Sequence, residues 1–256
     1  MPVDGHWTPI VGQRLSSLLL KPNGERSGRL AVFDLDNTTI KNDCGEAFFH
    51  FLAEEGRLPP SRIREYYEKA RKEGGPIAYP WVVSLMAGMK EAEVYSLCKE
   101  AIRKELKKEI GEKELGGVPI AQGIRPYPEM KGLMKQMKQA GFEIWVISAS
   151  NRWVVETTIQ EIGLTVDHFI GMAVTVEDGL LTNSPVKPQP AGPGKREVIE
   201  QKIGRPPNFV AGDSASDFPM MELATDGALL IDHGRKECQT MAEEKGWMIQ
   251  PAFSVR

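Results

Sequence analysis

A short run of consecutive apolar residues near the N-terminus ends abruptly in acids. Leu30–Phe33 is apolar, Asp34 follows directly, and Asp36 comes two residues later, in the sequence LAVFDLDNTT of residues 30–39. Consecutive apolar residues are typical of a parallel strand that is buried on both faces. Ligands of open α/β sheets bind beyond the carboxyl ends of such strands. The pattern therefore predicts two acids at an active site, although Asp also ends strands for purely structural reasons.

From Pro126 onward, helical and strand patterns alternate. An apolar stripe of methionines and leucine at 130–137 predicts a helix, and Glu177-Asp178-Gly179 predicts a hairpin turn. The other expected elements are strands at Glu143–Ile147, Phe169–Val174, Asn208–Ala211 and Ala228–Ile231, a last short strand, and helices at Trp153–Ile162, Gly194–Ile203, Phe218–Ala224 and Arg235–Lys245. Repeated strand–helix units predict an α/β fold whose parallel sheet is covered on both faces.

Two regions differ from this alternation. Residues 1–29 form an N-terminal arm, in which leucines at 15, 18 and 19 predict a short helix on the outside of the core, ended by Pro22-Asn23-Gly24. Residues 44–120 contain helical patterns, the longest over about Lys90 to Ile110, and no strand pattern. We expect a helical cap of three or four helices there, with glycines between Gly111 and Gly123 forming an irregular return path. Residues 30–43 and 121–256 would then form the core.

Composition excludes several classes of protein. The 256 residues carry a formal net charge of -3, and no basic surplus indicates a nucleic-acid partner. No apolar run approaches the ~20 residues that span a bilayer, so no membrane role is expected. The N-terminus lacks the pattern of a secretory signal, which predicts a cytoplasmic protein, or a periplasmic one if a signal was trimmed. Three scattered cysteines predict neither a disulfide framework nor a zinc site, and the oligomeric state cannot be predicted.

Two later segments carry side chains or main-chain groups that could bind a phosphate. The strand at 143–147 is followed by Ser148-Ala149-Ser150-Asn151 and then a helix, whose free N–H groups favour an anion. Ser150 or Asn151 could instead serve only as a helix cap. Lys195 opens a helix, where the helix dipole disfavours a cation unless an anion lies nearby. Lys187, in the preceding loop, is the alternative for this role.

Two further acids follow the strand at 208–211. Gly212 permits close approach of the backbone, and Asp213 and Asp217 come directly after it. Mg²⁺ prefers carboxylates, water and phosphate oxygens as ligands. Asp213 alone could be a helix cap, but four acids placed beyond strand ends favour a magnesium site.

These groups together make phosphate-ester cleavage chemically feasible. Asp34 is a weak nucleophile and repels a phosphate dianion, but Mg²⁺, Lys195 and Ser148 would offset that repulsion. Asp36 could protonate the leaving alkoxide and then, once ionised, activate water against an aspartyl-phosphate.

The motifs resemble those of the haloacid dehalogenase superfamily. DLDNT at 34–38, Ser148, Lys195 and GDSASD at 212–217 match its four motifs in order, over residues 30–231. The resemblance implies a Rossmann-like, doubly wound core with an inserted helical cap. It implies Asp34 as the nucleophile, Asp36 as the acid/base, and Ser148, its neighbour Ala149 and Lys195 as phosphate-binding residues. Mg²⁺ would be held by Asp34, the Asp36 carbonyl and Asp213, with Asp217 in support.

Within the superfamily, the chain is similar to the phosphoserine phosphatase-like branch, and especially to phosphorylcholine phosphatases. In that branch an acid at the start of the cap holds the substrate amine, which implies a specificity role for Asp43 or Glu46. The fourth motif departs from the usual GDGAND, because Ser214 and Ser216 replace Gly and Asn. Aromatic residues of the cap could hold a quaternary ammonium or simply form the core of the cap; they are Phe48, Tyr66, Tyr67, Tyr79 and Trp81.

The sequence therefore predicts a Mg²⁺-dependent phosphomonoester hydrolase that acts on a small phosphorylated metabolite through an aspartyl-phosphate. A phosphotransferase that uses the same intermediate, or a phosphate-ligand binding protein without catalysis, remains an alternative.

Overall fold

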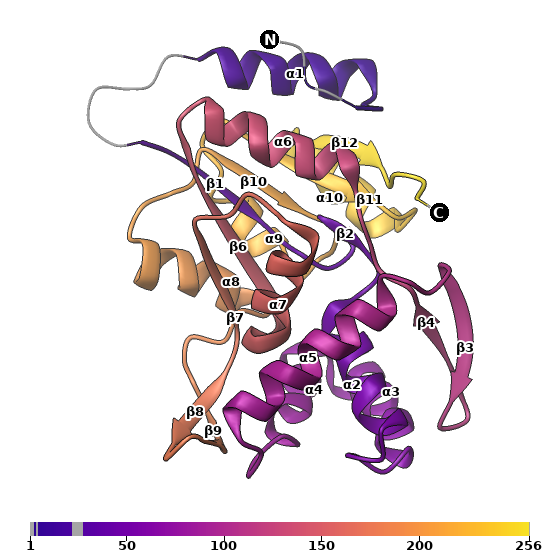
Figure 1. Ribbon diagram of the computed structural model, residues 1–256. Coiled ribbons are helices and arrows are strands. Elements are labelled where there is room, and N and C mark those ends of the chain that lie inside the picture. The colour runs from indigo at the N-terminus through magenta and orange to yellow at the C-terminus, as the bar shows by residue number, and fades with distance from the viewer. Residues whose placement is uncertain (1–2, 4, 22–27, 256) are drawn as a thin grey trace.

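The central element of the fold is a parallel sheet of six strands (Figure 1). The computed structural model describes residues 3, 5–21 and 28–255. Their main sheet has the order β12-β11-β10-β1-β6-β7, and all neighbouring pairs are parallel. Its strands are β1 Arg29–Phe33, β6 Phe142–Asn151, β7 His168–Met172, β10 Phe209–Gly212, β11 Gly227–Asp232 and β12 Met248–Pro251. The predicted α/β fold is confirmed.

Both faces of the sheet are covered by helices, as strand β1 illustrates. Ala31 and Phe33 belong to one apolar cluster, and Leu30 and Val32 belong to another, because successive side chains of a strand point to opposite faces. The first cluster includes side chains of α1 Pro9–Leu20, α6 Pro128–Gln139 and α7 Arg152–Ile162, and the second includes those of α8 Pro193–Val198, α9 Phe218–Met221 and α10 Lys236–Lys245. A π-helical turn, Ile199–Ile203, continues α8. The doubly wound arrangement follows from these two clusters.

The N-terminal helix packs on the outside of the core, as expected. Its residues Val11, Leu15 and Leu18 are buried in the first cluster. The predicted break at Pro22-Asn23-Gly24 lies outside the described residues.

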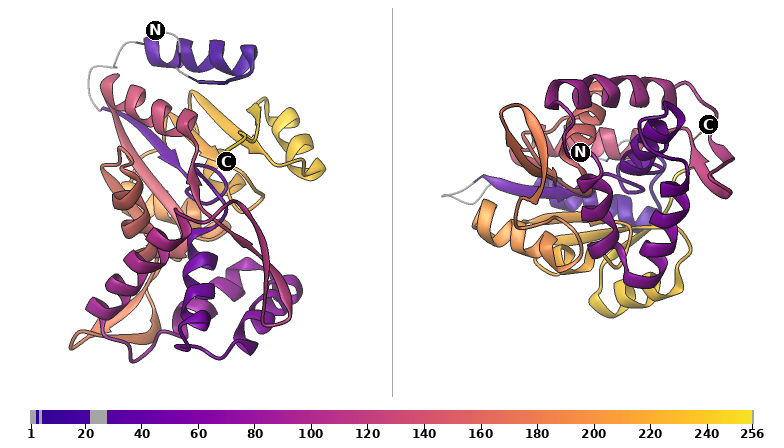
Figure 2. Two further views of the ribbon diagram at one scale, coloured as in Figure 1. Left: turned by 45° about the vertical axis from the view of Figure 1, so that its right-hand side comes forward. Right: turned by 90° about the horizontal axis from the view of Figure 1, so that it is seen from below.

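The chain leaves the core after β2 Ile40–Lys41 and returns through β5 Arg125–Pro126, and these two short strands pair antiparallel. Between them lie four helices, α2 Cys44–Glu54, α3 Ser61–Glu73, α4 Gly75–Ser84 and α5 Glu91–Glu105. Figures 1 and 2 show this inserted segment beyond the carboxyl ends of the strands, on the side opposite to α1. The number of helices agrees with the expected three or four.

Two details of the inserted segment were wrongly predicted. Strands β3 Gly111–Leu115 and β4 Val118–Gln122 form an antiparallel hairpin where an irregular return was expected. Gly116 and Gly117 turn the chain with φ of +61° and +75°, a conformation that favours glycine. Strand β3 has charges at 112–114 and β4 contains Pro119, which argues against a strand, and of the residues in these two strands only Ile120 is buried. Helix α5 also ends at Glu105 and not near Ile110.

A second hairpin joins the core to the inserted segment. Strands β8 Val174–Glu177 and β9 Leu180–Pro185 flank the predicted turn, and Leu181 exchanges main-chain hydrogen bonds with the α4–α5 loop. Gly88 N donates to Leu181 O at 2.7 Å, and Leu181 N donates to Met89 O at 2.9 Å. Helix α5 also packs on α7, where Trp153 Nε1 donates to Glu91 at 2.9 Å. The inserted segment is thus attached to the core at more than the two chain crossings.

The three cysteines, Cys44, Cys98 and Cys238, are free and buried. No helix among the described residues is long and apolar enough to cross a membrane.

Candidate active site

The buried ion pair between Asp34 and Lys195 lies at the centre of the site. Lys195 Nζ donates to Asp34 Oδ1 at 2.6 Å and to Asp217 Oδ1 at 2.6 Å. Asp34 follows β1 and Lys195 lies in the first turn of α8, so two distant elements supply the pair. The rival candidate, Lys187, is exposed in the loop before α8. Of the two predicted lysines, the structure therefore brings Lys195 to Asp34.

Asp217 fixes the loop that follows β10. Its Oδ2 accepts hydrogen bonds from the main-chain N–H groups of Asp213 and Ser214, both at 3.0 Å. Gly212 makes this possible, because a Cβ at position 212 would lie 2.5 Å from the Asp217 Cβ. The predicted close approach at Gly212 is thus an approach to Asp217.

Three acids of the site have the composition and spacing of a divalent cation site. Asp34, Asp213 and Asp217 are buried, and each offers one carboxylate oxygen in a group whose atoms all lie within 4.8 Å of one another. Oxygen ligands of this kind suit Mg²⁺. The carboxylate of Asp36 lies outside this group, which leaves its main-chain carbonyl as the predicted ligand atom.

The pKa values reflect the crowding of these acids. Burial raises the pKa of Asp34 well above its usual range, and neighbouring acids add to this while Lys195 opposes it. Burial and then Asp217 raise the pKa of Asp213 to about 7, against the opposing guanidinium of Arg235. Burial lowers the pKa of Lys195, but Asp217 and Asp34 more than compensate and raise it. A bound cation would relieve the repulsion among the carboxylates.

The Asp36 carboxylate accepts hydrogen bonds from three donors. Its Oδ1 accepts from Cys44 N at 2.7 Å, and its Oδ2 accepts from Ser148 Oγ at 3.0 Å and Ser150 Oγ at 2.7 Å. Ser148 is fully buried behind Asp36, whereas Ala149 lines the cavity of the site. The hydroxyl predicted to bind phosphate therefore points to the predicted acid/base.

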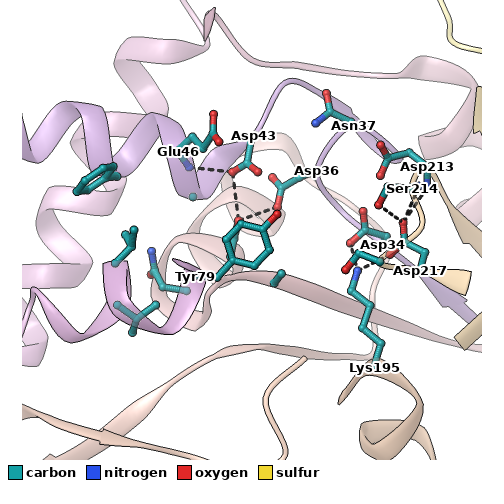
Figure 3. A pocket seen from close by; sticks show the side chains of 18 of the residues that line it. Asp34, Asp36, Asn37, Asp43, Glu46, Tyr79, Lys195, Asp213, Ser214 and Asp217 are labelled. Atoms are coloured by element: carbon teal, nitrogen blue, oxygen red, sulfur yellow. Dashed lines mark hydrogen bonds and ion pairs between the residues drawn. The ribbon is translucent and has the colours of Figure 1, made fainter. Parts of the chain in front are cut away.

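At the start of α2, two acids face the site from the inserted segment. Asp43 caps the helix by accepting from Glu46 N at 2.8 Å (Figure 3). Glu46 accepts from the hydroxyls of Tyr66 at 2.9 Å and Tyr67 at 3.0 Å. Burial raises the pKa of both acids, with Asp36 adding to the shift of Asp43 and the two tyrosine hydroxyls opposing that of Glu46.

A cavity of about 260 Å³ joins these two groups of acids. One end is lined by Asp34, Asp213 and Lys195, and the other by Asp43 and Glu46. Among the five cap aromatics named above, Tyr66 and Tyr79 line the cavity, together with Phe49. Its size suits a small molecule and not a polymer.

Arg235 and Ser150 line the cavity and bond to its acids, but neither was predicted to have a role at the site beyond a helix cap. Arg235, after β11, donates to Asp213 Oδ2 and lines the cavity. Ser150 had been considered only as a helix cap, a role that Asn151 fills through Val154 N. The position of Arg235 shortly after a predicted strand was the available indication, since the acids were recognised by the same criterion.

A family model described as haloacid dehalogenase-like hydrolase matches residues 31–222. The chain belongs to this family. The resemblance to the haloacid dehalogenase superfamily is thus confirmed. The prediction that the chain is a phosphatase of this family is confirmed by the names of its relatives, given next. The match covers the strands that carry Asp34, Ser148 and Asp213 as well as the inserted segment.

Curated relatives of this family member are named as phosphatases. The chain is 24% identical to histidinol-phosphatase of Neisseria meningitidis over 86% of its own length and 97% of the relative. It is 28% identical to phosphoserine phosphatase of Archaeoglobus fulgidus over 78% of its length, and 25% identical to phosphorylcholine phosphatase of Pseudomonas aeruginosa over 59%. It spans only 51% and 48% of these last two relatives.

Solved structures support the fold. A protein of unknown function from Anaerococcus prevotii has a TM-score of 0.76 at 18% identity, with 95% of this chain and 92% of that chain covered. A substrate-bound phosphoserine phosphatase has a TM-score of 0.56 at 19% identity, with 88% and 93% covered.

Proposed function

We propose that this family member is a Mg²⁺-dependent phosphomonoester hydrolase that acts on a small metabolite through an aspartyl-phosphate. The observation that carries the proposal is the buried contact of Lys195 with Asp34 at one end of the cavity, beside Asp213 and Asp217. The names of the curated relatives support phosphate-ester hydrolysis.

In this proposal, Asp34 is the nucleophile. Its Oδ1 lies against Lys195, and its Oδ2 accepts from Thr38 Oγ1 at 3.2 Å, so the carboxylate is held in one orientation. A carboxylate oxygen attacks phosphorus, the bond from phosphorus to the leaving oxygen breaks, and the phosphoryl group remains on Asp34. Lys195 then offsets negative charge on the phosphoryl oxygens, with Ser148 and Ala149 as the other proposed phosphate-binding residues.

Asp36 is the general acid and then the general base in this proposal. In its protonated form it gives a proton to the leaving oxygen, and the resulting carboxylate then removes a proton from the water that attacks the aspartyl-phosphate. The three hydrogen-bond donors around Asp36 stabilise that carboxylate between the two steps.

Mg²⁺ fits the donors that this chain provides. Asp34 and Asp213 would hold it with the Asp36 carbonyl, and Asp217 would keep Lys195 and the Asp213 loop in place. When bound, the ion supplies positive charge that offsets the repulsion between the carboxylate and the phosphate dianion.

The other end of the cavity favours a substrate that carries a protonated nitrogen. Asp43 and Glu46 lie there, and the basic side chains among the described cavity residues, Lys195 and Arg235, are paired with other acids. A buried carboxylate is costly without a positive partner. A substrate cation would provide that partner, and the faces of Tyr66 and Tyr79 would add cation–π attraction.

The test is phosphate release from a panel of esters in Mg²⁺ and in EDTA. The panel contains phosphoethanolamine, phosphorylcholine, phosphoserine, histidinol phosphate, sugar phosphates and p-nitrophenyl phosphate. We expect metal-dependent release that is fastest for amine-bearing esters. Transfer of phosphate to an added alcohol, in place of water, would establish the phosphotransferase alternative. Tight binding of an ester by folded protein without release would favour the binding-protein alternative.

A further inference from the structure

A single serine hydroxyl lies between acids of the two ends of the cavity. Ser150 Oγ is 2.7 Å from Asp36 Oδ2 and 3.3 Å from Asp43 Oδ1. Ser150 comes from the end of β6, Asp36 from the loop after β1, and Asp43 from the start of α2. The hydroxyl therefore connects the proposed acid/base with a residue of the substrate end.

The chain makes room for this contact. A Cβ at Gly45 would lie 2.3 Å from Ser150 Oγ and 2.9 Å from Ser150 Cβ, so only glycine at position 45 allows α2 to approach as it does. Gly45 is in a helix, where alanine is the better helix former. Glycine at this position is thus explained by the space that Ser150 occupies and not by helix formation.

The distances from Ser150 Oγ to Asp36 and to Asp43 indicate which of the two acids accepts the hydroxyl proton. A serine hydroxyl has one proton to donate and two lone pairs that accept. The shorter contact marks Asp36 as the acceptor of that proton, and the longer one leaves Asp43 as a secondary neighbour. This hydrogen bond of 2.7 Å to Oδ2 restricts the rotation of the Asp36 carboxyl group within the cavity.

We propose that Ser150 is a positioning residue for Asp36, which it aligns for proton transfer to the leaving oxygen. This inference rests on the function proposed above. Asp34 forms the new bond to phosphorus, the bond to the leaving oxygen breaks, and the proton of Asp36 moves to that oxygen. Ser150 does not touch the reacting atoms. Its effect therefore depends on how much the leaving group needs a proton.

The experiment compares two esters that differ in this need. An alkyl phosphate such as phosphoethanolamine leaves as a basic alkoxide, whereas p-nitrophenyl phosphate leaves as a stable phenolate. The value of kcat/KM covers the steps up to the first phosphoryl transfer and excludes the later hydrolysis of the aspartyl-phosphate, which is common to both esters. A positioning role for Asp36 therefore lowers kcat/KM selectively for the alkyl ester.

Ser150→Ala should lower kcat/KM for phosphoethanolamine by about tenfold or more and for p-nitrophenyl phosphate by less than about threefold, since general acids contribute ~10²–10⁴. Gly45→Ala keeps the Ser150 hydroxyl but displaces it. It should also lower kcat/KM more for phosphoethanolamine than for p-nitrophenyl phosphate, but by less than Ser150→Ala does. Ser96→Ala is the control, because its hydroxyl is exposed and donates to Ala92 O of its own helix. Thermal unfolding of each variant shows whether the fold is kept.

Equal losses for the two esters with both variants, or no loss with either, would overturn the positioning role while the proposed function stands. If the wild-type protein releases phosphate from neither these two esters nor the rest of the panel, the proposed function fails and this inference fails with it.

Discussion

Lys195 Nζ lies 2.6 Å from Asp34 Oδ1, although 161 positions of sequence separate the two residues. Both side chains are almost fully buried, with relative exposures of 3% and 7%. Removing one member of a buried ion pair leaves an uncompensated charge and typically costs about 3–5 kcal/mol. The pair therefore affects both the stability of the protein and the charge that a phosphate would meet.

Lys195→Met should lower kcat/KM by about 10²–10³, the usual effect of losing one electrostatic contact to a developing charge. It should also lower the free energy of unfolding, because Asp34 and Asp217 lose their shared cation. Lys187→Met is the matched control, since this lysine is exposed in the loop before α8. Ester kinetics and chemical denaturation test both effects. Similar activity for the two variants would contradict the phosphate-binding role of Lys195.

Asp34→Asn should abolish turnover without unfolding the protein. Lys195 keeps its second partner, Asp217, at 2.6 Å in this variant, so removing the charge of Asp34 leaves no unpaired cation, and asparagine has the same shape. We expect a loss of more than about 10³ in kcat, because the nucleophile is removed. Asp178→Asn, at the exposed β8–β9 turn, provides the control. Substantial phosphate release by folded Asp34→Asn would refute the aspartyl-phosphate.

Removing the metal should stop the reaction and lower the melting temperature. A ligand present at 100 times its Kd stabilises the folded state by about 2.7 kcal/mol, and Mg²⁺ should do so through Asp34 and Asp213. Differential scanning calorimetry with Mg²⁺ and with EDTA measures this shift. In Asp213→Asn the shift should shrink or vanish. An unchanged shift in that variant would place the ion elsewhere.

The features that could be predicted from the sequence are those that depend on local order along the chain. A buried parallel strand is recognisable from a few consecutive apolar residues, and its carboxyl end is defined by the residue that follows. Asp34 and Asp213 directly follow β1 and β10, and Ser148 lies in the last part of β6, so all three are near the carboxyl ends of neighbouring strands. Lys195 was identified from a conflict with the helix dipole, which is also a local property.

The features that were missed depend on contacts between distant segments. Strand β3 has alternating charges and β4 contains a proline, so both resemble a loop until they pair. Ser150 meets Asp36 across 114 positions, and Arg235 meets Asp213 from the next strand of the sheet. No pattern within either segment specifies its partner.

Glu46→Gln should reduce the preference for amine-bearing esters. The variant keeps the size of the side chain and one acceptor oxygen for a tyrosine hydroxyl, with an amide N–H group facing the other, but it removes the charge that would pair with a substrate cation. We expect kcat/KM to fall about 10–100-fold for phosphoethanolamine, or about 1.4–2.8 kcal/mol, and to change little for p-nitrophenyl phosphate. Glu54→Gln, at the far end of α2, is the control. Equal effects on both esters would contradict a cation site at Glu46.

His50 should make the protein less stable as the pH falls below about 6.5. Burial, and then Lys113 and Lys108, lower its pKa to about 3, and its Nε2 lies 3.1 Å from the Tyr67 hydroxyl. Between pH 6.5 and pH 3 the unfolded chain binds a proton at this residue and the folded protein does not, so the free energy of unfolding rises with pH in this window. The contribution between pH 5 and pH 7 is about 2 kcal/mol. His50→Gln should remove that part of the slope in urea unfolding at several pH values. A slope that is the same in wild type and His50→Gln would mean that His50 takes up its proton in the folded protein as readily as in the unfolded chain.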